Sequence, residues 1–253
     1  MASDDTYPVI VGVAQQTWRE SDYNRTPTDA MYEVARAATE DAGGENIRGA
    51  IDAVASIRFI ADTNPDAGAI FPRNPGAEIA SRLGIDNPAL YVGAIGGNTP
   101  QYLVNRLVEK VCGGEHRAVL LAGAELMATF FSALRGGGDI SQWAGTPAKE
   151  PPTIGEERDG LNAQEMLHGL YEPINTYPLF ENSLKHHLQL DKAAHSQLIA
   201  EISSSMSAVA ARNPYAWRQD ALSTEDIATV ATSNRYIGFP YTRAMNAVLE
   251  VDM

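Results

Sequence analysis

The residues of this sequence best placed to do chemistry form a short turn, Gly96-Gly97-Asn98-Thr99. The two glycines permit a tight turn, and Asn98 or Thr99 can cap a helix that follows. Backbone N–H groups at a helix start can hold a carboxylate or a thioester oxygen. The alternative interpretation is that these four residues form only a structural turn and a helix cap.

A predicted strand–turn–helix–strand unit positions this turn within residues 89–125. Ala89–Ala94 is a short apolar run typical of a buried strand, and Ala118–Leu121 is a second one. The helix between them carries apolar residues at helical spacing, namely Leu103, Leu107, Val108 and Val111. Open α/β sheets bind ligands at the carboxyl ends of their strands, so the turn is a candidate site.

The preceding residues continue the alternation of strands and helices. Pro8–Ala14 is predicted to be a buried strand and Ile51–Ile60 another, while Asp29–Ala42 is predicted to be a helix capped by Thr28. Pro75–Leu83 reads as a short helix. The first 125 residues therefore predict an α/β fold, with helices packed on a sheet.

The character of the sequence changes after Met127. Residues 145–160, rich in glycine and proline, predict a long excursion, and 233–242 predict a loop. Helices are predicted over 161–170, 177–187 and 192–212. The apolar segment 244–251 comes just before the last residue, and we expect the natural fold to continue beyond it.

The composition excludes several classes of protein. The net charge is −13 and the pI is near 4.7, which argues against nucleic-acid binding. No apolar run approaches the roughly 18 residues that span a bilayer, so no membrane association is expected and the cytoplasm is the default location. The motifs GxSxG, HExxH, GxGxxG and the P-loop are absent.

The remaining reactive side chains have ordinary structural explanations. Cys112 is the only cysteine, which excludes an internal disulfide or a multi-cysteine metal site, and we expect it to be buried. We expect His116 to be solvated and the histidines at 186, 187 and 195 to lie on the surface. Adjacent Glu156 and Glu157 point apart and form no acid–base pair.

Five stretches, in order, resemble the amino-terminal half of the thiolase superfamily. They are similar to sterol-carrier-protein thiolases and actinobacterial thiolase-like proteins of acetyl-CoA acetyltransferase type. The stretches are VIVGVAQQTW, AIGGNTPQYLVNRLVEKVCGGEHRAVLLAGAELM, YPLFENSLKHH, AARNPYAWRQ and GFPYTRAMNAVLEVDM. The resemblance implies a thiolase-like core over 1–127, an inserted helical loop domain over 128–234, and a return to the core over 235–253.

The sequence departs from the family where a thiolase has its nucleophile. In thiolases the turn after the strand that matches Ala89–Ala94 carries a cysteine that attacks a thioester. Here the matching residue is Gly96 or Gly97, and neither can be acylated. The family's second-half histidine and second cysteine would lie beyond Met253. This chain by itself is therefore not expected to complete a thiolase cycle.

The resemblance adds three candidate residues outside the turn. His168 falls in a region that faces acyl-CoA in the family, although a lone histidine in a helix is more often structural. Tyr241 is a catalytic candidate because cysteine-less relatives include retro-aldolases that transfer protons through tyrosines; the alternative is a packed loop residue. Asn182, with Glu181, either lines the pocket or simply caps and solvates a helix.

The implied function is carbon–carbon bond chemistry on a coenzyme A thioester. It would be an acyltransferase or aldol lyase of lipid metabolism or steroid degradation, with acyl-CoA as substrate and no cofactor. The alternative is a non-catalytic acyl-CoA-binding or scaffold subunit. The family also implies a homo-oligomer with Leu90–Val92 near its interface, a complementing thiolase-like chain, or a zinc-ribbon partner protein.

Overall fold

The structure is a computed structural model that describes residues 7–63, 70–145, 148–158, 160–246 and 251–253. The chain divides into two compact units. The first comprises Met1–Glu157 with Leu249–Met253, and the second, Arg158–Val248, is inserted between these two parts.

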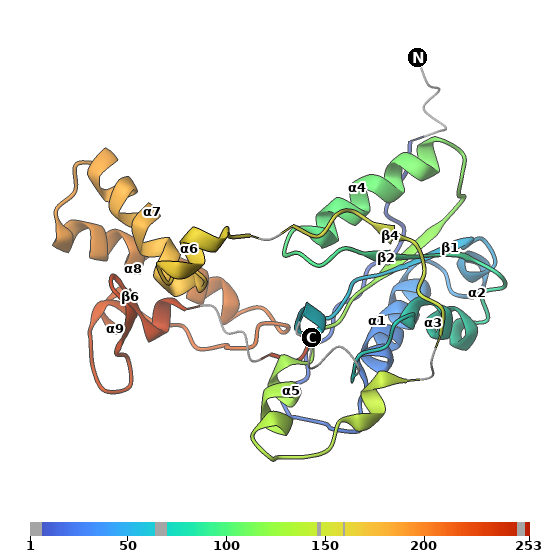
Figure 1. Ribbon diagram of the computed structural model, residues 1–253, viewed down its shortest axis with the longest axis horizontal. Coiled ribbons are helices and arrows are strands. Elements are labelled where there is room, and N and C mark those ends of the chain that lie inside the picture. The colour runs from blue at the N-terminus through green and yellow to red at the C-terminus, as the bar shows by residue number, and fades with distance from the viewer. Residues whose placement is uncertain (1–6, 64–69, 146–147, 159, 247–250) are drawn as a thin grey trace. The chain divides into compact units, whose positions relative to one another are not determined.

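The first unit is built on a four-stranded parallel sheet with the order β3-β1-β2-β4 (Figure 1). Its strands are β1 (Ala53–Ser56), β2 (Ala89–Gly93), β3 (Val119–Ala122) and β4 (Thr153–Ile154). Ser56 is in register with Val92 of β2 and with Ala122 of β3, so these three strands end at one edge. The predicted α/β class is confirmed, and the expected excursion over 145–160 contributes the edge strand β4.

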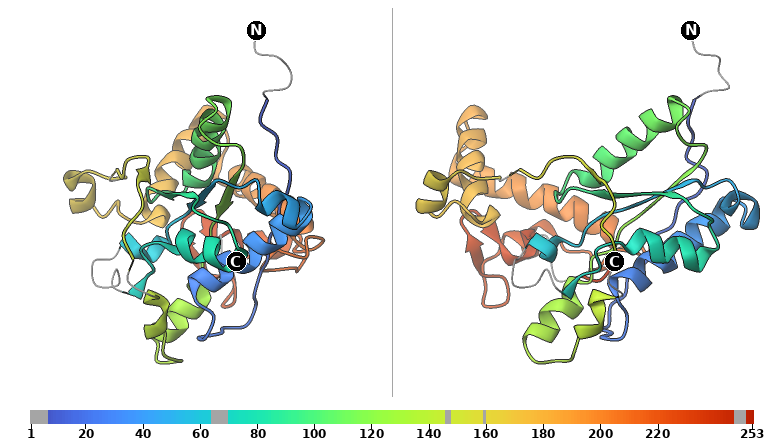
Figure 2. Two further views of the ribbon diagram at one scale, coloured as in Figure 1. Left: turned by 90° about the vertical axis from the view of Figure 1, so that its right-hand side faces the viewer. Right: turned by 45° about the vertical axis from the view of Figure 1, so that its right-hand side comes forward.

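Helices cover both faces of this sheet (Figures 1 and 2). Val54 faces the core that includes α1 and α3, whereas its neighbour Ala55 packs with Leu103 and Leu107 of α4. This alternation is what a strand buried on both faces requires. The helices of this unit are α1 (Pro27–Asp41), α2 (Glu45–Arg48), α3 (Pro75–Leu83), α4 (Thr99–Cys112) and α5 (Met127–Leu134), with single turns at Ile60–Thr63 and Ser141–Ala144.

An aromatic cluster packs around Phe59, in the segment that follows β1. Phe59 stacks on Phe71 at 4.7 Å between ring centroids and meets Phe130 and Trp143 edge-on at 6.0 Å. All four side chains are at most 5% exposed. Burying each ring contributes on the order of 2 kcal/mol, so the cluster fixes the segment that leaves β1.

The predicted strand Pro8–Ala14 is wrong. Residues 7–16 form no ladder with any described strand, and Val9 and Ile10 are 76% and 79% exposed. Contacts with α1 hold the run instead: Val13 N–H donates to Asp41 Oδ2, and a Cβ on Gly12 would lie 2.2 Å from the Ala38 carbonyl. A paired strand and an extended run of this kind have the same apolar pattern, so the pattern alone could not separate them.

The start of α1 also differs from the prediction. Thr26, not Thr28, is the N-cap, and it forms a capping box with Asp29. Thr28 is 3% exposed because it points into the core. Both threonines suit a cap by type, so only packing separates them.

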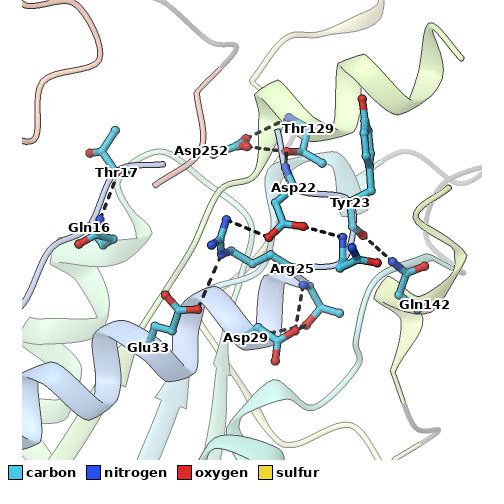
Figure 3. A network of polar contacts seen from close by, with 12 residues as sticks. Gln16, Thr17, Asp22, Tyr23, Arg25, Asp29, Glu33, Thr129, Gln142 and Asp252 are labelled. Atoms are coloured by element: carbon cyan, nitrogen blue, oxygen red, sulfur yellow. Dashed lines mark hydrogen bonds and ion pairs between the residues drawn. The ribbon is translucent and has the colours of Figure 1, made fainter. Parts of the chain in front are cut away.

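Polar contacts fasten the last residues to α5 (Figure 3). The Asp252 carboxylate accepts from the Thr129 N–H at 3.1 Å and from its hydroxyl at 2.6 Å. The same hydroxyl accepts from the Asp22 N–H, and Trp18 N–H donates to the Asp252 carbonyl. Residues 247–250, half of the apolar segment expected over 244–251, lie outside the described residues.

The second unit is helical with a small hairpin. The three predicted helices are confirmed: α6 and α8 are shorter than predicted, whereas α7 begins four residues earlier than the predicted helix 177–187. The expected loop 233–242 contains two short antiparallel strands. No helix in the described ranges is long and apolar enough to cross a membrane. The elements are α6 (Ala163–Leu167), α7 (Pro173–His187), α8 (Lys192–Ala210), α9 (Thr224–Ala228), β5 (Tyr236–Gly238), β6 (Tyr241–Thr242) and a turn at Arg243–Met245.

Candidate functional site

The loop between β2 and α4 lies at the carboxyl edge of the sheet, as predicted. The Thr99 hydroxyl donates to the Ala94 carbonyl at 2.6 Å, and its N–H donates to the Gly96 carbonyl at 3.0 Å. These two bonds close a tight turn. Asn98 is the N-cap residue, but its side chain makes no capping bond, so Thr99 holds the loop instead.

The loop presents backbone donors at a helix start. Gly96, Gly97 and Asn98 are exposed, and the N–H groups of Gly97 and Asn98 reach no acceptor in the part of the chain that the structure describes. Unpaired N–H groups at the amino end of a 14-residue helix favour a partial negative charge. The geometry can therefore hold a carbonyl or carboxylate oxygen.

The two glycines of the loop differ in the room around them. A Cβ on Gly96 would lie 3.0 Å from Asn98 Oδ1 and 3.3 Å from Thr99 Oγ1, whereas a Cβ on Gly97 would meet nothing within 4 Å. Gly97 is thus the position at which a side chain would project freely from the loop.

Glu125, which was not among the predicted site residues, also lies at the carboxyl edge of the sheet. Its Oε1 accepts from the Ile60 N–H at 2.9 Å, while its Oε2 is buried without a hydrogen-bond partner among the described residues. Burial raises the pKa of this carboxyl to about 7, against the lowering effect of the Ile60 bond. Glu125 lies three residues after the end of β3, just as Gly96 lies three residues after the end of β2. This position along the sequence could have identified it as a candidate.

Tyr241 in the second unit lies beside acidic and phenolic groups. Burial raises the pKa of its phenol, and the nearby Glu181 carboxylate and Tyr177 raise it further. A higher pKa stabilises the neutral phenol against ionisation, so Tyr241 is a hydrogen-bond donor rather than a phenolate base.

Glu181 also meets His195, which corrects the expectation that His195 is a surface residue. His195 Nε2 lies 3.0 Å from Glu181 Oε2, and the whole histidine is only 4% exposed. The helix spacing placed His195 correctly on α8, but it could not show that α7 covers that side. His186 and His187 are exposed, as expected.

The other two candidates lie on the surface of this unit. His168 is exposed at the C-cap of α6, where its Nδ1 is 2.8 Å from the Gln164 carbonyl, and Asn182 is exposed on α7. Within the described residues no hydrogen bond or ion pair joins either of them to Tyr241. Their proposed roles rest on the family resemblance.

Two expectations near the opposite edge of the sheet are wrong. The His116 side chain is 9% exposed rather than solvated, because its ring lies 2.9 Å from the Tyr91 hydroxyl and 3.5 Å from Asp52. Cys112 is exposed rather than buried, because the buried face of α4 ends one turn earlier at Leu107. Among the described residues, no three His, Cys, Asp or Glu side chains gather as a metal site.

An apolar cavity of about 630 Å³ also lies in the first unit. Residues 7–12 form one wall, and the other walls come from α1, α4 and β3. Val104, Val108 and Val111 of α4 line it, which explains why this helix is apolar beyond its buried face.

The comparisons identify the fold. No protein-family model matches the chain, and no curated protein matches it. The crystal structure of a monomeric SCP2-thiolase like protein type 1 from Mycobacterium smegmatis is 30% identical in sequence and superposes with a TM-score of 0.73. The match covers 99% of this chain and 45% of that protein, so the chain spans less than half of its relative's length. The chain therefore has an SCP2-thiolase-like α/β fold.

Proposed function

We propose that this chain binds a coenzyme A thioester, with the thioester oxygen at the loop Gly96–Thr99. The observation that carries the proposal is the pair of unengaged N–H groups of Gly97 and Asn98 at the carboxyl edge of an SCP2-thiolase-like sheet. Such donors stabilise the negative charge that develops on a carbonyl oxygen.

The reaction that suits this loop is carbon–carbon bond chemistry without an acyl-enzyme. Gly96 and Gly97 offer no nucleophile, so a covalent thiolase cycle has no starting residue in this loop. An enolate held by backbone donors needs only proton transfer, as in an aldol lyase or an atypical thiolase. Tyr241, His168 and Asn182 belong to the second unit, and their roles toward a coenzyme A ester stay predictions from the family resemblance.

Calorimetric titration with propionyl-CoA tests the binding proposal. A leucine at Gly97 has room in the unliganded loop, so Gly97→Leu folds normally but blocks the ligand oxygen. Gly160→Leu is the matched control, because Gly160 also has no atom within 4 Å of an added Cβ. We expect micromolar binding by the wild type and by Gly160→Leu, and at least about tenfold weaker binding by Gly97→Leu. Equal binding by all three proteins would rule out the loop.

A second candidate function is that of a non-catalytic scaffold subunit. It is favoured by the exposed aliphatic run that lines the apolar cavity, since Val9, Ile10, Val11 and Val13 are 55–79% exposed. Contiguous apolar surface of this kind commonly marks a protein interface. The partner would be a second copy, a complementing thiolase-like chain or a zinc-ribbon protein.

Sedimentation equilibrium distinguishes a scaffold subunit that self-associates from the acyl-CoA-binding function that is proposed first. We expect a scaffold to associate with rising concentration and Ile10→Asp to abolish that association. A monomer at all concentrations, combined with binding of propionyl-CoA, would support the enzymatic proposal alone.

A further inference from the structure

Glu125 and the loop Gly96–Thr99 leave the sheet at the same level. Ala122, Ser56 and Val92 are aligned across β3, β1 and β2. Glu125 follows Ala122 by three residues, and Gly96 follows Val92 by four. Both therefore lie just beyond the carboxyl edge, on either side of the segment that leaves β1.

The Glu125 side chain reaches from the end of β3 to the segment that leaves β1. Its Oε1 accepts from the N–H of Ile60, which lies four residues beyond Ser56, the last residue of β1. The carboxyl group thus lies over the exit of β1, and the loop leaves from the next strand. The loop and Glu125 leave strands that are separated by β1, so with neighbouring strands about 5 Å apart the two lie on the order of 10 Å from each other along the edge. This interval accommodates a thioester whose oxygen contacts the loop and whose α-carbon approaches Glu125.

The environment of Glu125 suits proton transfer. Oε2 is buried and has no hydrogen-bond partner in the described chain, and an unpaired charge at such a site is unfavourable. Burial accordingly raises the pKa of the carboxyl to about 7, where it can accept and return a proton near neutral pH. The terminal torsion of a glutamate is soft, so either oxygen can turn toward a ligand.

We propose that Glu125 is the base that takes the α-proton of an acyl-CoA held at the Gly96–Thr99 loop, an inference that rests on the proposed function. The C–H electron pair moves into the α-carbon–carbonyl bond, and the carbonyl electrons move to the oxygen, which gives an enolate. The proton remains on the Glu125 carboxyl. The carboxyl proton exchanges with solvent, and delivery of a solvent-derived proton from Glu125 to the α-carbon regenerates the thioester, so water is the only other participant.

Deuterium exchange of propionyl-CoA in D₂O measures this step directly by proton NMR. The proteins are the wild type, Glu125→Gln and Glu115→Gln. In Glu125→Gln the amide oxygen can still accept a hydrogen bond from the Ile60 N–H, but the amide cannot act as a base. Glu115 lies at the opposite end of β3, where it is exposed and bonds Lys110, so its substitution is the matched control. Binding of propionyl-CoA is measured in parallel by calorimetry.

We expect the wild type and Glu115→Gln to exchange the α-protons, and Glu125→Gln to bind the ester but exchange it at least about 100-fold more slowly. Exchange by Glu125→Gln at the wild-type rate would overturn the assignment. Binding by the wild type without exchange above the free-ester rate would also overturn it and leave the binding proposal intact. Absence of wild-type binding would instead refute the proposed function, and the assignment with it.

Discussion

Burial and the charge of the Glu181 carboxylate both stabilise the neutral form of the Tyr241 phenol. The Glu181 charge adds to the effect of burial and raises the pKa of Tyr241. Glu181→Gln removes that charge at nearly constant shape. We therefore expect the substitution to lower the pKa of Tyr241, measured as tyrosinate absorbance and assigned by difference from Tyr241→Phe.

Glu201→Gln is the control for this titration, because Glu201 is exposed on α8 and bonds Gln197 instead. It should leave the pKa of Tyr241 unchanged. An unchanged or higher pKa in Glu181→Gln would show that the two side chains do not interact in solution, and the role of Tyr241 as a neutral donor would lose its support.

Glu125 makes the stability of the protein depend on pH. Its pKa is raised from 4.5 to about 7 in the folded state, so the folded state binds the proton more tightly. The resulting stabilisation is fully present below the unfolded pKa of 4.5 and is lost as pH rises through about 7. Urea unfolding of wild type and Glu125→Gln measures it, because glutamine does not titrate.

Between about pH 5 and about pH 8 we expect the wild type to lose about 2–3 kcal/mol of unfolding free energy relative to Glu125→Gln. The figure follows from roughly two pKa units at 1.36 kcal/mol each. Parallel pH dependences of the two proteins would mean that the carboxyl is hydrated and titrates normally.

Sequence patterns could identify the loop residues but not their partners at this scale. Gly96–Thr99 was predictable because glycines and a helix cap follow one another along the chain. Glu125 and Ile60 are 65 residues apart, and their meeting depends on the pairing of β3 with β1. The pair of Glu181 and His195 likewise required the packing of α7 on α8, which no local pattern specifies.

At the level of elements, Gly93 determines how closely α4 packs on the end of β2. A Cβ there would lie 2.5 Å from Thr99 Cγ2 and 2.8 Å from Leu103 Cδ1. We expect Gly93→Ala to destabilise the protein by about 1–3 kcal/mol, because the start of α4 must move away. Gly97→Ala, which meets no atom, should change the stability by less than about 0.5 kcal/mol.

Chemical denaturation of these two glycine variants measures the difference. Because Thr99 bonds the Ala94 carbonyl, displacement of α4 in Gly93→Ala should also weaken binding of the thioester. Equal stability of both variants would contradict the close packing of loop and strand.

Helices and strands were predicted well where the local apolar pattern determines them. They were predicted poorly where contacts with distant parts of the chain determine them. The strand–helix–strand unit over 89–125 was predictable from its apolar periodicity and its glycines. The run 8–14 has the same apolar signal as β2, yet it forms no ladder with a described strand, and local periodicity does not show which apolar runs find a partner. Thr26 and Thr28 are equally good caps by type, and burial of Thr28 in the core decides between them.

At the level of the whole molecule, the sequence predicts the fold class but not which candidate residues belong to which unit. The loop and Glu125 belong to the first unit, whereas Tyr241, Glu181 and His195 belong to the second. The chain also covers 45% of its structural relative. The proposed binding of the thioester at the carboxyl edge of the sheet therefore uses only residues of the first unit.

The most direct test of this account is the change in backbone amide NMR shifts when propionyl-CoA is added to the chain. We predict the largest changes at Gly97 and Asn98, accompanied by changes at Ile60 and Glu125, and little change at His116 and Arg117 on the opposite edge of the sheet. Changes confined to residues 7–12 and the apolar cavity, or no changes at all, would contradict binding at the carboxyl edge.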